Sequence, residues 1–266
     1  MALSPAVMGI VNVTPDSFFP ASRTLAADEA IARGRAYFLE GADIVDVGGE
    51  STRPGATPVA EDEELTRVVP VVRALAQLGP VSIDTQKESV ARAAIAAGAS
   101  VLNDVSSSLV AIAGELNVGY VAMHRQGDSR VMQDNPTYAD VVAEISDFLT
   151  AVADDARRVG VSQLWLDPGI GFGKTVEHNL TLLAHIDHFV ELAANYGAGV
   201  LIGTSRKRFL SHLGHDTLDV DERLEASLAT EAWAMVQGVS MVRVHDVRET
   251  VQLRDLLTKS PEGVTP

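Results

Sequence analysis

The stretches EGADIVDV (residues 40–47) and AGASVLND (97–104) share one pattern that recurs along the chain. A glycine is followed by a small residue and then by an apolar run that includes or ends in a polar side chain. Glycine at this place suits the positive φ angle of a helix C-cap. The apolar run suits a parallel strand that is buried on both faces. Both stretches therefore predict a strand that follows the end of a helix.

The same pattern occurs throughout the 266 residues. Closer copies are YGAGVLIG (196–203) and QGVSMVRV (237–244), and looser ones are LGPVSID (78–84), NVGYVAMH (117–124) and VGVSQLWLD (159–167). The run AVMGIVN (6–12) brings the number of candidate strands to eight, and apolar residues at helical spacing lie between them, at 65–75, 141–152 and 182–190. Strands that alternate with helices in this way predict an α/β fold, a single (β/α)8 TIM barrel over residues 1–266.

The alternative architecture is an open doubly wound sheet. No G-x-G-x-x-G follows the first strand, which weighs against it. The polar segment 125–137 is expected to be a long loop after the fifth strand, and the tail from about 259 to 266 is expected to fray.

Composition narrows the class of protein. The net charge is −15, which argues against nucleic acid or an anionic membrane as the partner. The chain has no cysteine, and its first residues show no signal peptide, so we expect a cytoplasmic protein. No apolar run approaches the roughly 20 residues that a membrane span needs.

Hydrogen-bonding side chains stand at the ends of all eight predicted strands: Asn12, Asp46, Asp84, Asn103, His124, Asp167, Ser205, Arg243 and His245. A single residue of this kind is ordinarily a cap or a turn. Asp84 could cap the next helix in DTQKES, and Asp167 could form a turn in DPG. A polar residue at every strand end instead predicts a polar ligand over the barrel mouth, because buried polar groups need partners.

Four cations lie near these strand ends, namely Arg53, Lys207, Arg243 and His245. Arg53 belongs to DVGGESTRPGA (46–56), where glycines permit close backbone approach and hydroxyl groups can donate hydrogen bonds. Arginine binds phosphate in a bidentate manner. The stretch therefore predicts an anion site.

Seven motifs follow one another in a fixed order: MGIVNVTPDSF (8–18), DVGGESTRPGA (46–56), VSIDT (81–85), LNDV (102–105), LDPGIGFGKTVEHN (166–179), GTSRKRFL (203–210) and RVHDV (243–247). Together they resemble the dihydropteroate synthase family. The resemblance implies a (β/α)8 enzyme, usually a homodimer through helices near the C-terminus. Such an enzyme joins p-aminobenzoate to 6-hydroxymethyl-7,8-dihydropterin diphosphate and releases 7,8-dihydropteroate and diphosphate. The resemblance also implies that a pterin cation forms before the amine attacks, and that sulfonamides compete with the aminobenzoate.

The resemblance further implies roles for individual residues. The pterin pocket would be formed by Asp84, Asn103, Met123, Asp167 and Lys207, with Arg243 stacked on the pterin ring. The diphosphate would lie against Asn12, Arg53, Arg243 and His245, and Asn12 would also bind Mg²⁺, the expected cofactor. The aminobenzoate would lie against Thr52, Pro54, Phe172 and Ser205. Lys207, Arg53 and Asn12 are the expected catalytic residues, and His124 is expected to pack in the core instead of binding ligand.

Two places depart from the family pattern. Phe19-Pro20-Ala21-Ser22 stands where the family commonly continues Ser-Asp-Gly-Gly, so the expected lid at 14–24, which acts with 48–57, should be stiffer. The chain after Asn103-Asp104 is short, and we expect its helix to be reduced to a turn.

Two other functions remain open on the sequence. A non-catalytic pterin-binding paralogue with an altered first lid loop is the alternative to the synthase. A corrinoid-linked pterin methyltransferase domain would share the barrel and the pterin carboxylates. It has no need of a diphosphate clamp, so STRPG (51–55) and SRK (205–207) weigh against it.

Overall fold

The computed structural model describes residues 4–13, 20–50, 58–127, 132–212 and 217–258. Eight parallel strands close into a barrel in chain order, and β1 pairs with both β2 and β8. The strands are β1 (Ala6–Asn12), β2 (Ile44–Gly48), β3 (Val81–Asp84), β4 (Val101–Asp104), β5 (Gly119–Met123), β6 (Leu164–Asp167), β7 (Gly199–Ile202) and β8 (Met241–Val244). The predicted (β/α)8 fold is confirmed.

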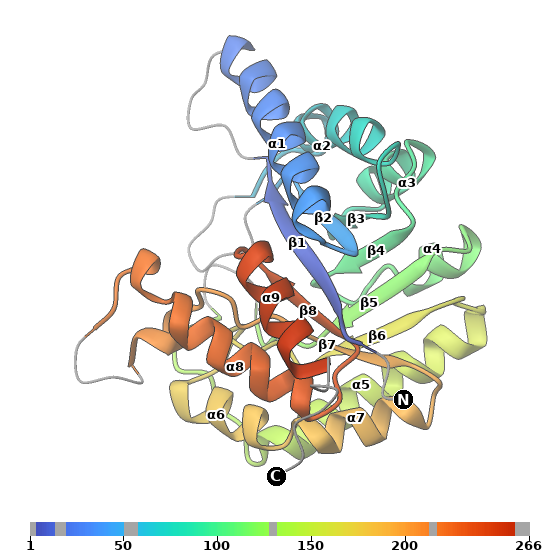
Figure 1. Ribbon diagram of the computed structural model, residues 1–266. Coiled ribbons are helices and arrows are strands. Elements are labelled where there is room, and N and C mark those ends of the chain that lie inside the picture. Colours follow the sequence, from blue (N-terminus) through green and yellow to red (C-terminus); the bar gives the residue numbers. More distant parts are fainter. Residues whose placement is uncertain (1–3, 14–19, 51–57, 128–131, 213–216, 259–266) are drawn as a thin grey trace.

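Helices surround the barrel in the order of the chain (Figure 1). They are α1 (Pro20–Glu40), α2 (Glu61–Leu75), α3 (Glu88–Ala96), α4 (Val110–Glu115), α5 (Val141–Val159), α6 (Val176–Ala184), α7 (Ile186–Ala194), α8 (Leu224–Val236) and α9 (Val247–Thr258), with short 3-10 turns η1 (Arg208–His212) and η2 (Val220–Glu222). None of these helices is long and apolar enough to cross a membrane.

The pleat of the strands divides the barrel interior into two layers. Seven apolar side chains form the lower layer: Met8, Ile44, Val101, Val121, Trp165, Leu201 and Met241. Alternate residues of a strand point to the same face, so positions two residues further along also face inward. On five of these strands that position carries Asp46, Asn103, Met123, Asp167 or Arg243. An apolar plug therefore supports a largely polar upper layer.

Three local expectations were wrong. The pattern at 182–190 predicts one helix, but α6 ends at Ala184 and α7 begins at Ile186. In a continuous helix the Thr181 carbonyl would accept a hydrogen bond from the His185 N–H. Here the His185 ring bonds that carbonyl, and the His185 N–H donates to the Leu182 carbonyl instead. Residues 20–24, expected in a lid loop, belong to α1, because proline is well suited to the first helical position.

The third error concerns the segment after β4, which is a helix of six residues and not a turn. Asp104 fixes its start by accepting hydrogen bonds from Ser106 N and Leu109 N, each at 2.8 Å. The segment after β5 does lack helix and strand where it is described, at 124–127 and 132–140. Residues 14–19 and the tail 259–266 lie outside the described residues.

Tyr120→Phe tests how β4 and α4 are joined. The buried Tyr120 hydroxyl donates to Asp104 Oδ2 at 2.9 Å, so its removal should lower the free energy of unfolding by about 1–3 kcal/mol. Urea denaturation followed by circular dichroism measures this. Tyr196→Phe removes a hydroxyl from a half-buried ring and should cost less than about 0.5 kcal/mol. Equal losses in the two variants would contradict the role of the Tyr120–Asp104 bond.

Candidate functional site

A cavity of about 710 Å³ opens at the carboxyl ends of the strands, above the apolar plug. Its size is that of a small-molecule site. Ten predicted site residues line it: Asn12, Asp84, Asn103, Met123, Asp167, Phe172, Ser205, Lys207, Arg243 and His245. The other three, Thr52, Arg53 and Pro54, lie outside the described residues. The strand pleat and the β6–α6 and β7–α8 loops thus bring together side chains that are far apart in sequence.

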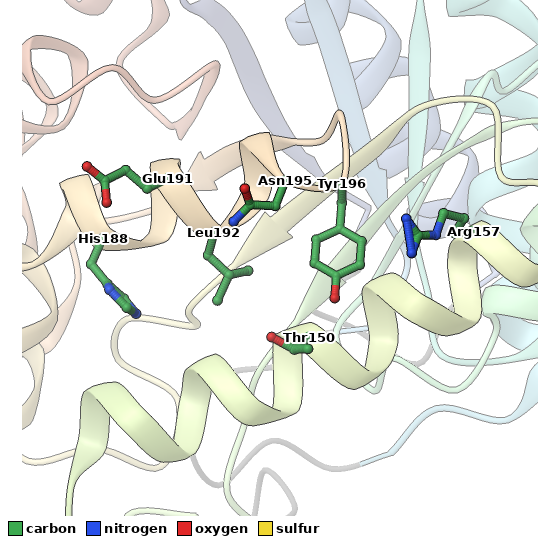
Figure 2. Close-up of a pocket in the computed structure, with 7 residues that line it drawn as sticks. All are labelled: Thr150, Arg157, His188, Glu191, Leu192, Asn195 and Tyr196. Atoms are coloured by element: carbon green, nitrogen blue, oxygen red, sulfur yellow. The ribbon is translucent and has the colours of Figure 1, made fainter.

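A second hollow, of about 440 Å³, lies on the outer ring between α5 and α7 (Figure 2). The Arg157 guanidinium lies 5.4 Å from the centroid of the Tyr196 ring, and His188 Nε2 lies 2.9 Å from Ser146 Oγ. None of the ten predicted site residues that the structure describes lines this hollow. The barrel mouth is therefore the candidate site.

Arg243 joins two buried carboxylates at the cavity floor. Its Nε donates to Asp46 Oδ2 and its Nη2 donates to Asp84 Oδ2, both at 2.7 Å. Asn103 Nδ2 also donates to Asp46 Oδ2, at 3.0 Å. The guanidinium is therefore fixed by its edge, and an edge-fixed guanidinium keeps a face that a flat ring can stack on.

Burial raises the pKa of Asp84 to about 7; Arg243 opposes the rise, whereas Asp46, Glu64 and Asp104 add to it. The buried Oδ1 atoms of Asp46 and Asp84 have no hydrogen-bond partner within the described part of the chain. Protonation of Asp84 relieves the repulsion from the neighbouring carboxylates. Asp84 does not cap the next helix, whose N-cap residue is Lys87.

Asp167 and Lys207 both line the cavity, and each contacts the backbone of the β6–α6 turn. Asp167 Oδ1 accepts a hydrogen bond from Gly169 N at 2.7 Å, so the predicted DPG turn is present. Lys207 Nζ donates to the Ile170 carbonyl and lies 4.5 Å from the centroid of the Phe172 ring. Burial raises the pKa of Asp167, and Lys207 opposes that rise. Burial lowers the pKa of Lys207 to about 8, although Asp167 opposes that shift.

The β8 end of the cavity is organised by two hydrogen-bonded groups. Ser205 Oγ accepts from His245 N at 3.1 Å and lies 3.3 Å from His245 Nδ1. Arg206 binds both oxygens of Asp246, with Nε–Oδ2 and Nη2–Oδ1 distances of 2.8 and 2.6 Å. Asp246, the residue after His245, is thereby fixed to Arg206, the residue after Ser205.

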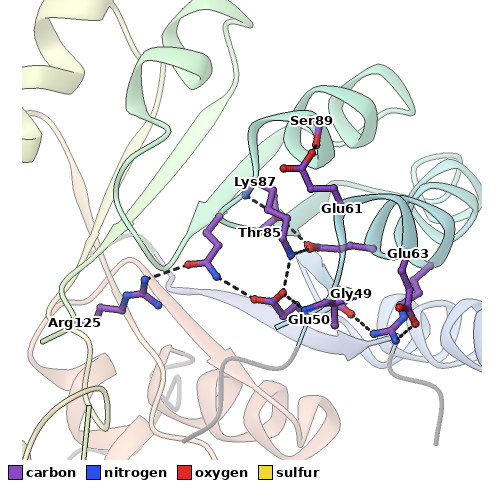
Figure 3. A network of polar contacts seen from close by, with 12 residues as sticks. Gly49, Glu50, Glu61, Glu63, Thr85, Lys87, Ser89 and Arg125 are labelled. Atoms are coloured by element: carbon purple, nitrogen blue, oxygen red, sulfur yellow. Dashed lines mark hydrogen bonds and ion pairs between the residues drawn. The ribbon is translucent and has the colours of Figure 1, made fainter. Parts of the chain in front are cut away.

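A polar network runs along the rim from the β2 loop to the β5 loop (Figure 3). Glu50 accepts from Lys87 Nζ at 2.7 Å, from Gln86 Nε2 at 3.0 Å and from Val59 N at 2.8 Å. Arg125 Nη2 donates to Gln86 Oε1 at 3.1 Å. Glu50 and Val59 flank residues 51–57, so one carboxylate holds together the two ends of the loop that carries the predicted anion site.

The sequence reasoning left out three residues at this mouth. Asp46 was noted as a strand end but given no role, and Glu50 and Lys174 were not considered. Glu50 and Lys174 line the cavity, and Asp46 is fully buried beneath Arg243. A signal for Asp46 was present, because it stands two residues after an apolar strand residue, as Asn103 and Asp167 do. His124 packs against the Phe148 ring at 5.0 Å, in agreement with the core role expected for it.

Comparisons with known proteins agree on one family. The sequence profile described as "Pterin binding enzyme" matches residues 8–245. Dihydropteroate synthase from Escherichia coli K12 is 41% identical over 256 residues, which cover 93% of this chain and 89% of that protein.

Two solved structures have TM-scores of 0.87 to this fold. Xanthomonas albilineans dihydropteroate synthase with 4-aminobenzoic acid is 41% identical and covers 100% of this chain and 95% of its own. The Yersinia pestis enzyme in a sulfonamide drug complex is 38% identical, with coverages of 97% and 94%.

Asp84→Asn tests the raised pKa of Asp84. Between pH 3.8 and about 7 the folded protein keeps a proton that the unfolded chain has released, so this group makes the wild type less stable as pH rises. The variant has no such proton. Its free energy of unfolding, relative to the wild type, should increase through that window and level off above it. Urea unfolding at several pH values measures the difference, and a difference independent of pH would contradict the assignment.

Proposed function

The chain belongs to the pterin binding enzymes and, among them, to the dihydropteroate synthases, and on that premise we propose how its barrel mouth carries out their reaction. The reaction joins 6-hydroxymethyl-7,8-dihydropterin diphosphate to p-aminobenzoate and releases 7,8-dihydropteroate and diphosphate. The observation that carries the proposal is the buried Asp167, which interacts with Lys207 and lies above an apolar plug in a cavity of about 710 Å³.

Recognition of the pterin rests on complementary hydrogen bonding. The 2-amino group and N3 of the ring present two parallel N–H donors, and a carboxylate can accept both. Asp167 supplies that carboxylate, while Asn103 and Asp84 line the adjoining floor. The guanidinium of Arg243, fixed by Asp46 and Asp84, stacks on the ring.

The reaction breaks the C–O bond between the pterin methylene and the diphosphate, and then forms a C–N bond to the arylamine, which loses a proton. Asn12, Arg53, Arg243 and His245 hold the departing diphosphate. The arylamine is neutral and needs no strong base to attack, so the site requires orientation and exclusion of water more than proton abstraction. We propose that the aminobenzoate approaches on the side of Lys207 and Phe172, and that Ser205, Thr52 and Pro54 contribute to its binding.

We also propose Mg²⁺ as the cofactor. The described residues contain no group of three or more His, Asp or Glu side chains that could hold a metal. Asn12 offers one oxygen at the end of β1, beside the cavity. Mg²⁺ commonly binds through one or two protein oxygens and substrate phosphates, so this donor set fits a metal that arrives with the diphosphate. When bound, Mg²⁺ would neutralise charge on the leaving group.

No observation supports the non-catalytic paralogue. The relative and both solved structures compared above are named as synthases. The test of the proposal is to incubate the protein with the dihydropterin diphosphate and Mg²⁺, with and without p-aminobenzoate. Diphosphate and dihydropteroate should appear in equal amounts when the amine is present. Pterin binding without condensation would favour the paralogue instead.

Arg53→Ala tests the anion site. It should weaken binding of the dihydropterin diphosphate by about 1.5–3 kcal/mol, because a hydrogen bond to a charged group is lost. Binding of 6-hydroxymethyl-7,8-dihydropterin, which has no diphosphate, should be unaffected in calorimetric titration. Arg73→Ala, in an exposed position of α2, is the matched control and should change neither affinity. Equal loss for both ligands in Arg53→Ala would remove the diphosphate assignment.

We further propose a homodimer and a cytoplasmic location. An apolar patch on α6 and α8 supports the dimer: Leu180, Trp233 and Val236 are 42%, 47% and 66% exposed, and Trp233 Nε1 donates to the Leu183 carbonyl of α6. The location follows from the substrate, because a diphosphate ester does not cross a bilayer unaided.

Val236→Glu tests the dimer. A charge placed in the patch should convert a dimer into monomers in sedimentation velocity, because an unpaired charge is costly to bury. Leu39→Glu, at an 89% exposed position of α1, is the control and should leave the assembly unchanged. A monomeric wild type would exclude the dimer.

A further inference from the structure

Lys174 lines the cavity, but its side chain is almost fully buried and is surrounded by acceptors. Only 3% of its surface is exposed. Its Nζ donates to the carbonyls of Gly169, Phe172 and His124 at 2.9, 3.1 and 3.4 Å, and lies 3.1 Å from His124 Nδ1. Burial lowers the pKa of His124 to about 3, so its ring is neutral and can accept. An ammonium group has three donors and no acceptor, which suits this shell.

The turn that Lys174 binds has little freedom of its own. Gly169, Gly171 and Gly173 adopt φ angles of 69°, 87° and 64°, which side-chain-bearing residues rarely adopt. A Cβ atom on Gly171 would lie 2.8 Å from Lys207 Cδ, and one on Gly169 would overlap the His124 carbonyl oxygen. The turn is therefore confined between two lysines, Lys174 and Lys207, both of which line the cavity.

Three groups of the turn contact Asp167 or Lys207, and their positions depend on the conformation of the turn. Gly169 N binds the Asp167 carboxylate, Ile170 O accepts from Lys207, and the Phe172 ring lies against the Lys207 ammonium. Lys174 bonds directly to the carbonyls of Gly169 and Phe172, one residue before and two residues after Ile170.

We propose that Lys174 is a positioning residue, which fixes the β6–α6 turn and so sets the orientation of the Asp167 carboxylate toward the pterin and of Phe172 toward the aminobenzoate. This inference rests on the proposed function. Lys174 acts through the turn and touches no reacting atom.

Lys174 also affects the charge of Asp167. The charged or titratable groups near this region include Asp167 of β6, His124 and Tyr138 after β5, Lys207 after β7 and Arg243 of β8. Burial raises the pKa of Asp167, and Lys207, the Gly169 N–H, Lys174 and Arg243 all lower it. Burial lowers the pKa of Lys174 to about 7, so below that pH the ammonium is mostly charged and opposes the rise in the pKa of Asp167.

Calorimetric titration with 6-hydroxymethyl-7,8-dihydropterin from about pH 4 to about pH 7 tests the inference. Protonation of Asp167 should weaken binding at the acidic end, because a neutral carboxyl group can no longer accept two N–H bonds. Lys174→Met removes the cation and the three donors. The Kd of the pterin should rise roughly tenfold or more, as expected when a binding group is displaced. The acidic loss of binding should also move to higher pH, because the pKa of Asp167 rises further.

Lys174→Gln separates the two effects. It keeps N–H donors for the turn but carries no charge, so the affinity near pH 7 should partly recover while the acidic loss stays at the higher pH. It also keeps the inference testable if Lys174→Met does not fold. Arg92→Met is the control, since Arg92 is a cation of the outer surface paired with Glu88 and Glu115, and the acidic loss of binding should stay at the wild-type pH.

The outcomes distinguish a failure of the proposed function from a failure of the role of Lys174. A wild type that binds no pterin at any pH would overturn the proposed function. A wild type that binds, together with Lys174 variants that keep both its Kd and its acidic limb, would overturn the role of Lys174 alone. A fall in thermal stability without either change would show that Lys174 serves folding only.

Discussion

The inside of a closed parallel barrel is a surface on which every second residue of each strand must either pack or find a polar partner. This chain meets the constraint in two layers. Apolar side chains from seven of the strands form the lower layer, and the upper layer carries carboxylates, an amide and a guanidinium. The plug keeps water away from the lower ends of these polar groups, so that their electrostatic interactions are strong and their pKa values shift. The position and the chemistry of the site both follow from this division.

The upper layer is arranged as cations between carboxylates. Arg243 lies between Asp46 and Asp84, and Asp167 interacts with Lys207 and Lys174. Buried pairs of this kind contribute little net stability, because the loss of hydration offsets most of the attraction. In this site the pairs fix the orientation of the charged side chains that line the cavity. In a protein of net charge −15, a local cation such as Arg243 is also what an incoming diphosphate can bind.

Much of this arrangement could be predicted from sequence, because it depends on local patterns. The glycine followed by an apolar run identifies each strand, and the polar residue that follows identifies most of the cavity floor. The break at His185 could not be predicted, since it depends on a ring taking a backbone carbonyl within an otherwise regular helical pattern. Lys174 was missed for a related reason: a lysine in a glycine-rich loop reads as exposed, and only the folded turn shows it surrounded by carbonyls. The roles of the individual site residues stay predictions, and Thr52, Arg53 and Pro54 lie outside the described residues.

The two tryptophans of the chain lie in places that differ sharply. Trp165 belongs to the apolar plug and is 7% exposed, whereas Trp233 stands 47% exposed on α8 with its indole N–H tied to the end of α6. Indole emission shifts to longer wavelength as its surroundings become more polar. The protein therefore carries two intrinsic optical probes, of which Trp165 reports the integrity of the barrel interior and Trp233 the outer helical surface.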